Sequence, residues 1–218
     1  MLTTAFDLTT VEIITIFAAY LFAATAKGVT GLGFSTTCLP ILVVAIGLKD
    51  ALPLVLIPSV CSNLVVMRQV GQFKPTILRF WPMLLATIPG LILGLWILSG
   101  IDGDRVKVVF GLVLLMWCGF SFLKPDLRLR DGLEGRIAPV SGICTGFLNG
   151  LTGSQVMPAV PFLMSLNLGR SAFIQAANCS FTMSSFIMMA GLGHLGLFTG
   201  VDVVISTLSM TLTINSKA

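Results

Sequence analysis

The sequence predicts an all-α, polytopic membrane protein with about seven transmembrane helices in two homologous halves, whose first helices are broken at glycines. Three observations support this fold class. The 218 residues are 56% hydrophobic and 10% charged, with a mean hydropathy of +1.00. Long stretches carry no charge, and a motif near the N-terminus recurs after the middle of the chain.

The composition excludes a soluble enzyme, a disordered tail and a nucleic-acid binder, since an ordinary soluble domain has about 25% charged residues. Uncharged runs cover Phe80–Ile101, Ile137–Gly169 and Ser171–Val201, and each is as long as the roughly 20 residues that cross a bilayer. The net charge of +4 arises from Lys and Arg in short loops, where they set orientation. We therefore expect the lipid bilayer, and no nucleic acid, as a partner.

The first half contains four predicted spans. The first begins near Val11, and a continuous helix over Val11–Gly47 would measure about 55 Å, longer than the hydrocarbon thickness. We therefore expect a break at Gly28–Gly33. The later spans are Ala51–Met67, the stretch from the basic loop Arg68–Lys74 to Ser99, and Val106–Leu123, and prolines interrupt two of them.

The second half repeats the first. Lys27-Gly-Val-Thr-Gly31 aligns with Asn149-Gly-Leu-Thr-Gly153 at an offset of 122 residues. After a one-residue gap, Pro40 aligns with Pro161, and Lys49 aligns with Arg170. The order of glycine break, proline, basic turn and next span is thus shared, which indicates an internal duplication.

The repeat predicts the domain boundaries. Residues 1–123 form the first membrane repeat, 124–136 a polar midpoint linker, and 137–218 a second repeat that is incomplete by this count. With four spans in the first half, the halves should have the same orientation in the membrane. Seven basic residues then share the N-terminal side against four opposite, which favours a cytoplasmic N-terminus. A re-entrant segment at Gly28–Gly47 would change this parity. The first segment has no basic residue before Lys27, so we expect it to be retained and not cleaved as a signal peptide.

The two glycine breaks predict an anion site. Broken backbone survives in a membrane only where protein or a water-filled cavity covers it, and paired half-helix N-termini in transporters suit an anion. Hydroxyl and amide side chains flank both breaks. The candidate substrate-binding residues are Lys27, Gly28, Thr30, Gly31, Ser35, Thr36, Asn63, Asn149, Gly150, Thr152, Gly153, Ser154, Gln155 and Asn178.

Each candidate has a structural alternative. Gly, Ser and Thr also allow close helix packing in membranes. Lys27 either faces a cavity or snorkels to an interface, and the sequence leaves both open. Lys49 and Arg170 are interpreted as markers of the membrane edge, and His194 as an interfacial or packing residue. The five cysteines lie apart in apolar runs and are interpreted as small core residues.

Several chemistries lack their motifs. The chain has no GxxxxGK[ST] phosphate loop and no HExxH or clustered His, Cys and Asp set, so we expect no ATP-driven pump, no metal and no cofactor. A serine protease pairing of Ser154 with His194 is disfavoured because nothing around Ser154 builds a catalytic turn. We do not expect an enzyme.

The two motifs also carry a resemblance. Gly28-Val-Thr-Gly-Leu-Gly-Phe-Ser with Leu39-Pro-Ile-Leu, repeated as Gly150-Leu-Thr-Gly and Val160-Pro-Phe-Leu, resembles the TauE/SafE family of sulfite exporter-like permeases. The resemblance covers nearly the whole chain. It implies two homologous halves and transport of small sulfur-containing or carboxylate anions, including sulfite, sulfoacetate and other organosulfonates.

The leading hypothesis is therefore a multi-pass inner-membrane permease for a small anion that works by alternating access. The alternative is a non-transporting membrane scaffold or assembly subunit, which needs no cavity. The discriminating feature is whether Lys27, Thr30 and Thr152 converge on a cavity or pack solidly against helices. A homo-oligomeric assembly is left open.

Overall fold

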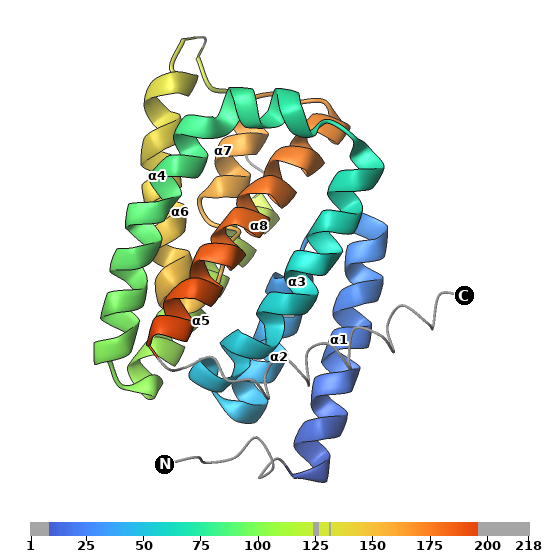
Figure 1. Cartoon of the computed structure of the whole chain (residues 1–218), viewed down its shortest axis with the longest axis vertical. Coiled ribbons are helices and arrows are strands. Elements are labelled where there is room, and N and C mark those ends of the chain that lie inside the picture. Colours follow the sequence, from blue (N-terminus) through green and yellow to red (C-terminus); the bar gives the residue numbers. More distant parts are fainter. Residues whose placement is uncertain (1–8, 124–126, 131, 196–218) are drawn as a thin grey trace.

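The computed structural model describes residues 9–123, 127–130 and 132–195, and over these ranges it is helical and contains no strand (Figure 1). The eight described helices are α1 (Thr10–Thr30), α2 (Phe34–Ile46), α3 (Leu48–Val70), α4 (Phe73–Gly100), α5 (Gly103–Leu123), α6 (Glu134–Thr152), α7 (Ala159–Ser165) and α8 (Arg170–His194). The first residues of α6 fall within the predicted linker at 124–136. Arg79 on α4 holds this end of α6 through a two-bond ion pair with Glu134, both bonds being 2.8 Å.

Local sequence signals explain where the helices end. Thr9 and Glu12 form a reciprocal capping box at the start of α1. Three helices, α1, α3 and α6, end at a glycine in the left-handed conformation, Gly31, Gly71 and Gly153. In each case the glycine N–H donates to the carbonyl four residues earlier, which satisfies one of the last helical acceptors.

The first predicted span is in fact two helices that run in opposite directions. The end of α1 at Gly31 contacts Ile174 in the first turns of α8. The end of α2 lies at the other end of the molecule, where Gly47 approaches Lys107 and Lys49 Nζ donates to Ile101 O at 3.1 Å. Because α2 reverses the chain, five helices and not four precede α6.

This extra reversal corrects the expected relation between the halves. Helices α1 and α3 are parallel, since Tyr20 bonds to Leu54 O and Lys27 bonds to Asn63. In Figure 1, α3 ascends while α4, α6 and α8 descend. The first helices of the two repeats, α1 and α6, therefore run antiparallel, and the expectation of equal orientation was wrong.

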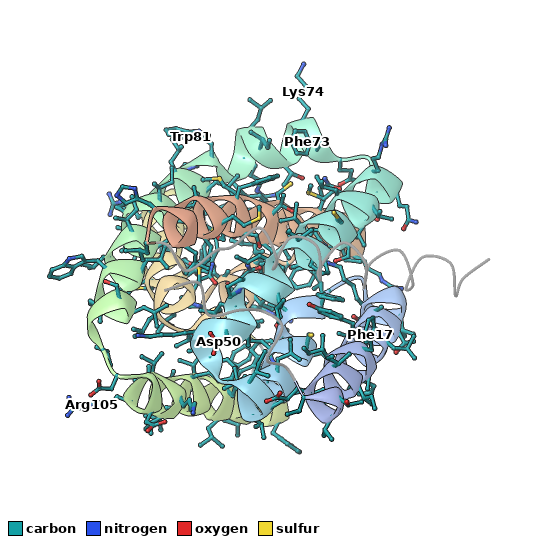
Figure 2. All side chains as sticks on the ribbon, turned by 60° about the horizontal axis from the view of Figure 1, so that its bottom comes forward. Phe17, Asp50, Phe73, Lys74, Trp81 and Arg105 are labelled. Atoms are coloured by element: carbon teal, nitrogen blue, oxygen red, sulfur yellow. The ribbon has the colours of Figure 1, made fainter. Side chains whose placement is uncertain are left out.

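The exterior of the molecule is apolar, and many polar side chains are buried among its apolar core residues. Four described helices, α1, α3, α4 and α5, are long and apolar enough to cross a membrane. Phe17, Phe73 and Trp81 project outward from the ribbon (Figure 2). In contrast, α8 buries Gln175, Asn178 and four Ser or Thr side chains between its neighbours. A soluble protein has the opposite arrangement, and an apolar outer surface of this extent suits lipid.

The closest helix contact joins α4 and α6 through glycines. Gly142, Gly146 and Gly150 follow one another every four residues on α6 and meet Gly90 and Gly94 on α4. A Cβ atom at any of these five positions would overlap a backbone carbonyl oxygen of the other helix. Small residues at this spacing let two membrane helices approach closely.

Candidate functional site

The two helix breaks have the same local geometry. Thr30 Oγ1 lies 2.9 Å from Ala26 O and 2.7 Å from Leu32 O, either of which can accept its proton, and it accepts from Leu32 N at 3.2 Å. Thr152 Oγ1 donates to Leu148 O at 2.6 Å and accepts from Ser154 N, also at 3.2 Å. A left-handed glycine follows each threonine, with φ of 77° at Gly31 and 73° at Gly153. The offset of 122 residues found in the sequence thus relates two of the hydrogen bonds at each break, and only Thr30 also contacts the carbonyl two residues later.

The breaks begin later than the sequence suggested. Gly28 and Gly150 were expected to be non-helical, but both lie within the last turn of a helix. Gly150 packs against the backbone of α4 at Leu91 and Gly94. The structure therefore gives Gly150 a packing role at the contact between α6 and α4.

The breaks do not face each other either. Gly31 contacts Ile174 on α8, and Asn178 Nδ2 donates to Gly31 O at 3.1 Å. Gly153 contacts Leu39 on α2 and Leu52 on α3. Each break therefore packs against helices of the other half of the chain. The two breaks lie toward opposite ends of the molecule.

The threonine hydroxyls stabilise the breaks, so Thr152→Val should lower stability. Each hydroxyl proton is already donated to a backbone carbonyl, and removing such a bond costs about 0.5–1.5 kcal/mol. Thr36→Val is the matched control, because the Thr36 hydroxyl on α2 bonds to no described residue. Thermal unfolding in detergent should show a lower midpoint only for Thr152→Val. Equal midpoints with weakened anion binding would instead restore the role that the sequence suggested.

A cavity of about 600 Å³ lies where the ends of α1 and α3 approach the start of α8. Lys27, Gly28, Thr30 and Gly31 line it from α1, and all four were expected at the site. Ser62 and Gln69 contribute from α3, and Arg170 and Ile174 from α8. Gly28 and Thr30 are also exposed, so the cavity reaches the surface at this end of the molecule.

Lys27 is the central group of this site. It is 4% exposed, and its Nζ donates to Asn63 Oδ1 on α3. Neither Lys27 nor Arg170 forms an ion pair with a described carboxylate. Asn63 Nδ2 is buried without a described partner, which leaves two adjacent donor groups, one of them charged. Since Lys27 is buried beside the cavity, the snorkelling alternative does not describe its position.

Two helix N-termini reinforce the positive charge. Phe34 and Arg170, the first residues of α2 and α8, both line the cavity. Neither helix has a side-chain cap at its start, so first-turn N–H groups remain available there. Such termini carry partial positive charge and bind anions.

The remaining candidates lie outside the lining of this cavity. Ser35 on α2 donates to Ser59 Oγ at 2.8 Å, and Gln155 Nε2 donates to Ser185 Oγ at 2.8 Å. Ser154, which precedes Gln155, is buried and shares no hydrogen bond with His194, at the end of α8. Asn149 is buried in α6 with both side-chain polar atoms unpartnered among the described residues.

Arg170, which the sequence analysis interpreted as a marker of the membrane edge, is exposed at the start of α8 and also lines the cavity. The alignment of Arg170 with Lys49 suggested equivalent roles, yet Lys49 bonds to a backbone carbonyl at the other end of the molecule. The usable signal was that Arg170 begins a helix, since a cation there joins an N-terminus that already attracts anions.

The apolar exterior and the long apolar helices are those of a multi-pass membrane protein, and its described part has a cavity, open at the surface, that Lys27 and Arg170 line. The chain matches the family described as "Sulfite exporter TauE/SafE" over residues 16–214. It belongs to this family, whose members are membrane transporters of sulfite-type anions and not enzymes. Neither the curated proteins nor the solved structures include a match.

Proposed function

We propose that the protein is an inner-membrane permease for small anions, with sulfur-containing oxyanions such as sulfite, sulfoacetate or other organosulfonates as the main class and small carboxylates as a second. The observation that carries this proposal is the buried Lys27 ammonium beside a cavity that also receives Arg170. A buried cation without a carboxylate is costly, and an anionic substrate compensates it.

We further propose transport by alternating access in two homologous, inverted halves with about seven crossings and glycine-broken first helices. The matched hydrogen bonds at Thr30 and Thr152 and the antiparallel directions of α1 and α6 support this architecture. Inverted repeats commonly place a substrate between discontinuous helices. Of the three residues chosen to discriminate the scaffold alternative, Lys27 and Thr30 line the cavity, which favours the permease, whereas Thr152 is buried outside its lining.

The test is flux through the purified chain in proteoliposomes. Labelled sulfite, methanesulfonate, sulfoacetate and acetate would be loaded in turn, with liposomes lacking protein as the baseline. We expect saturable sulfite or sulfonate movement above that baseline. Choline, a cation of similar size, should not move, and absence of flux for every anion would favour the scaffold.

The structure also changes the expected orientation in the membrane. The starts of α4, α6 and α8 gather at one end of the molecule (Figure 1), and they bring Arg79, Arg136 and Arg170 together there. Lys49, Arg105 and Lys107 lie at the other end. The positive-inside rule then places the first end in the cytoplasm and the start of α1 outside, contrary to the orientation expected from the sequence.

Reporter insertions test this orientation. Fluorescent-protein fusions ending at Gln72 and at Asn167 should both report the cytoplasm, whereas a phosphatase fusion ending at Asp102 should be active outside. The Asn167 position is decisive, because the four-span count placed it opposite Gln72. Opposite readings at these two sites would refute the inverted arrangement.

A further inference from the structure

The positions in the second half that correspond to Lys27 and Asn63 carry uncharged polar residues. The offset of 122 residues places Asn149 on α6 at the position of Lys27 on α1. After the one-residue gap, Ser184 on α8 takes the position of Asn63 on α3. By this alignment, Asn149 and Ser184 take the positions at which the first half bonds an ammonium to an amide.

These counterparts are buried and lack partners. Asn149 and Ser184 are each 1% exposed. Asn149 Nδ2, Asn149 Oδ1 and Ser184 Oγ bond to no group in the described part of the chain. Ser180 Oγ, one turn before Ser184 on α8, is in the same condition. Buried polar groups cost free energy unless they are hydrogen-bonded, so these four atoms are suited to a polar ligand.

Asn149 and Lys27 lie toward opposite ends of the molecule. Each stands four residues before the left-handed glycine that ends its helix, Gly153 or Gly31. Because α1 and α6 run antiparallel (Figure 1), equivalent positions in them approach opposite ends. Lys27 thus lies toward the end that carries Arg170. Asn149 lies toward the end at which α3 begins, where Gly153 contacts Leu52.

We propose that Asn149 and Ser184 form a second, uncharged subsite for the transported oxyanion, a role that rests on the proposed permease function. The Asn149 amide N–H groups and the Ser184 hydroxyl donate to oxyanion oxygens. Asn149 Oδ1 accepts a hydrogen bond from a water molecule that remains bound to the anion. The anion is then held by charge at the Lys27 end and by neutral donors at the Asn149 end.

Two substitutions remove this subsite with little change in shape. Asn149→Asp replaces the donor amide by a carboxylate that repels an anion, and Ser184→Ala removes the hydroxyl. Thr145→Val on α6 and Thr182→Val on α8 are matched controls, because both hydroxyls already donate to carbonyls of their own helices at 2.7 Å. Ser184→Thr, which keeps a hydroxyl, is the conservative variant.

The experiment measures sulfite flux in proteoliposomes and equilibrium sulfite binding in detergent for the same preparations. Asn149→Asp and Ser184→Ala should each lower flux by about tenfold or more, the effect of losing a hydrogen bond to a charged group. Sulfite binding should stay within about twofold of the unmodified chain, as expected for separate sites. The two controls and Ser184→Thr should keep both properties.

The outcomes separate the two proposals. If the unmodified chain neither binds nor moves any tested anion, the permease function itself fails. If it transports sulfite and both Asn149→Asp and Ser184→Ala transport equally well at equal reconstitution, only the second subsite is overturned. Equal losses in the variants and in the Thr→Val controls would likewise overturn it, because packing and not ligand binding would then explain the effect.

Discussion

Lys27→Gln should abolish most anion transport while leaving the fold intact. The glutamine amide can still donate to Asn63 Oδ1, so the contact between α1 and α3 keeps a hydrogen bond. The lost interaction is the charge-assisted bond to the substrate, worth about 1.5–3 kcal/mol, or about ten- to a hundredfold in affinity. Removing a buried charge is itself neutral or stabilising in many proteins, so expression should not fall.

A matched control isolates the position of the charge. Lys74→Gln makes the same chemical change at a side chain that projects from the start of α4 into the surroundings (Figure 2). Concentration-dependent sulfite flux would be measured for both variants, together with Lys27→Arg, which keeps the charge. We expect normal flux for Lys74→Gln and partial flux for Lys27→Arg. Normal flux for Lys27→Gln would remove Lys27 from the site.

Four residues that line the cavity were among the sequence candidates, because the signals that marked them are encoded locally. A glycine that adopts a positive φ, such as Gly31, is visible as a residue type at a repeated spacing. Lys27 is conspicuous because a charged side chain between apolar runs is costly in a bilayer unless it faces a cavity or reaches an interface. Asn63 was also expected, and the structure places it against Lys27.

The sequence did not predict that α2 is a separate helix. From Cys38 to Ile46 its residues are apolar, and it follows α1 after only three residues, so hydropathy does not separate the two helices. Hydropathy along the sequence does not report the direction of a helix, and a turn of three residues changes the hydropathy little. This single missed reversal changed the orientation of the halves, the side assigned to Arg170 and the location of the N-terminal helix.

The polarity of α6 and α8 has a related explanation. These two helices fall below the hydropathy that marks a candidate span, although α8 lies among the other helices at the centre of the molecule (Figure 1). A helix that contacts protein on most sides does not need to be apolar to reside in a membrane. Sequence patterns alone cannot separate such a helix from a surface one, because the difference lies in what surrounds it.

Gly146→Leu should prevent the protein from folding to its normal level in the membrane. Gly146 lies at the centre of the glycine contact between α6 and α4, where a Cβ atom would overlap Thr87 O and approach Leu91 N. These are backbone atoms in two long helices, so no side-chain rotation relieves the overlap. Overpacking of a tight interior typically costs about 1–3 kcal/mol and occasionally more, and a backbone clash belongs to the upper part of that range.

The matched control is Gly119→Leu, because Gly119 is also inside a helix but is exposed on α5, where an added Cβ atom would meet nothing within 4 Å. The same side chain there meets only the surroundings, and leucine favours a helix over glycine by roughly 0.5–1 kcal/mol. Membrane fractions and size-exclusion profiles in detergent should therefore show loss of monodisperse protein for Gly146→Leu and none for Gly119→Leu. If Gly146→Leu accumulated and eluted like the unmodified chain, α4 and α6 would have to be farther apart than their glycines indicate, and the packing that supports both halves of the transport path would need a different explanation.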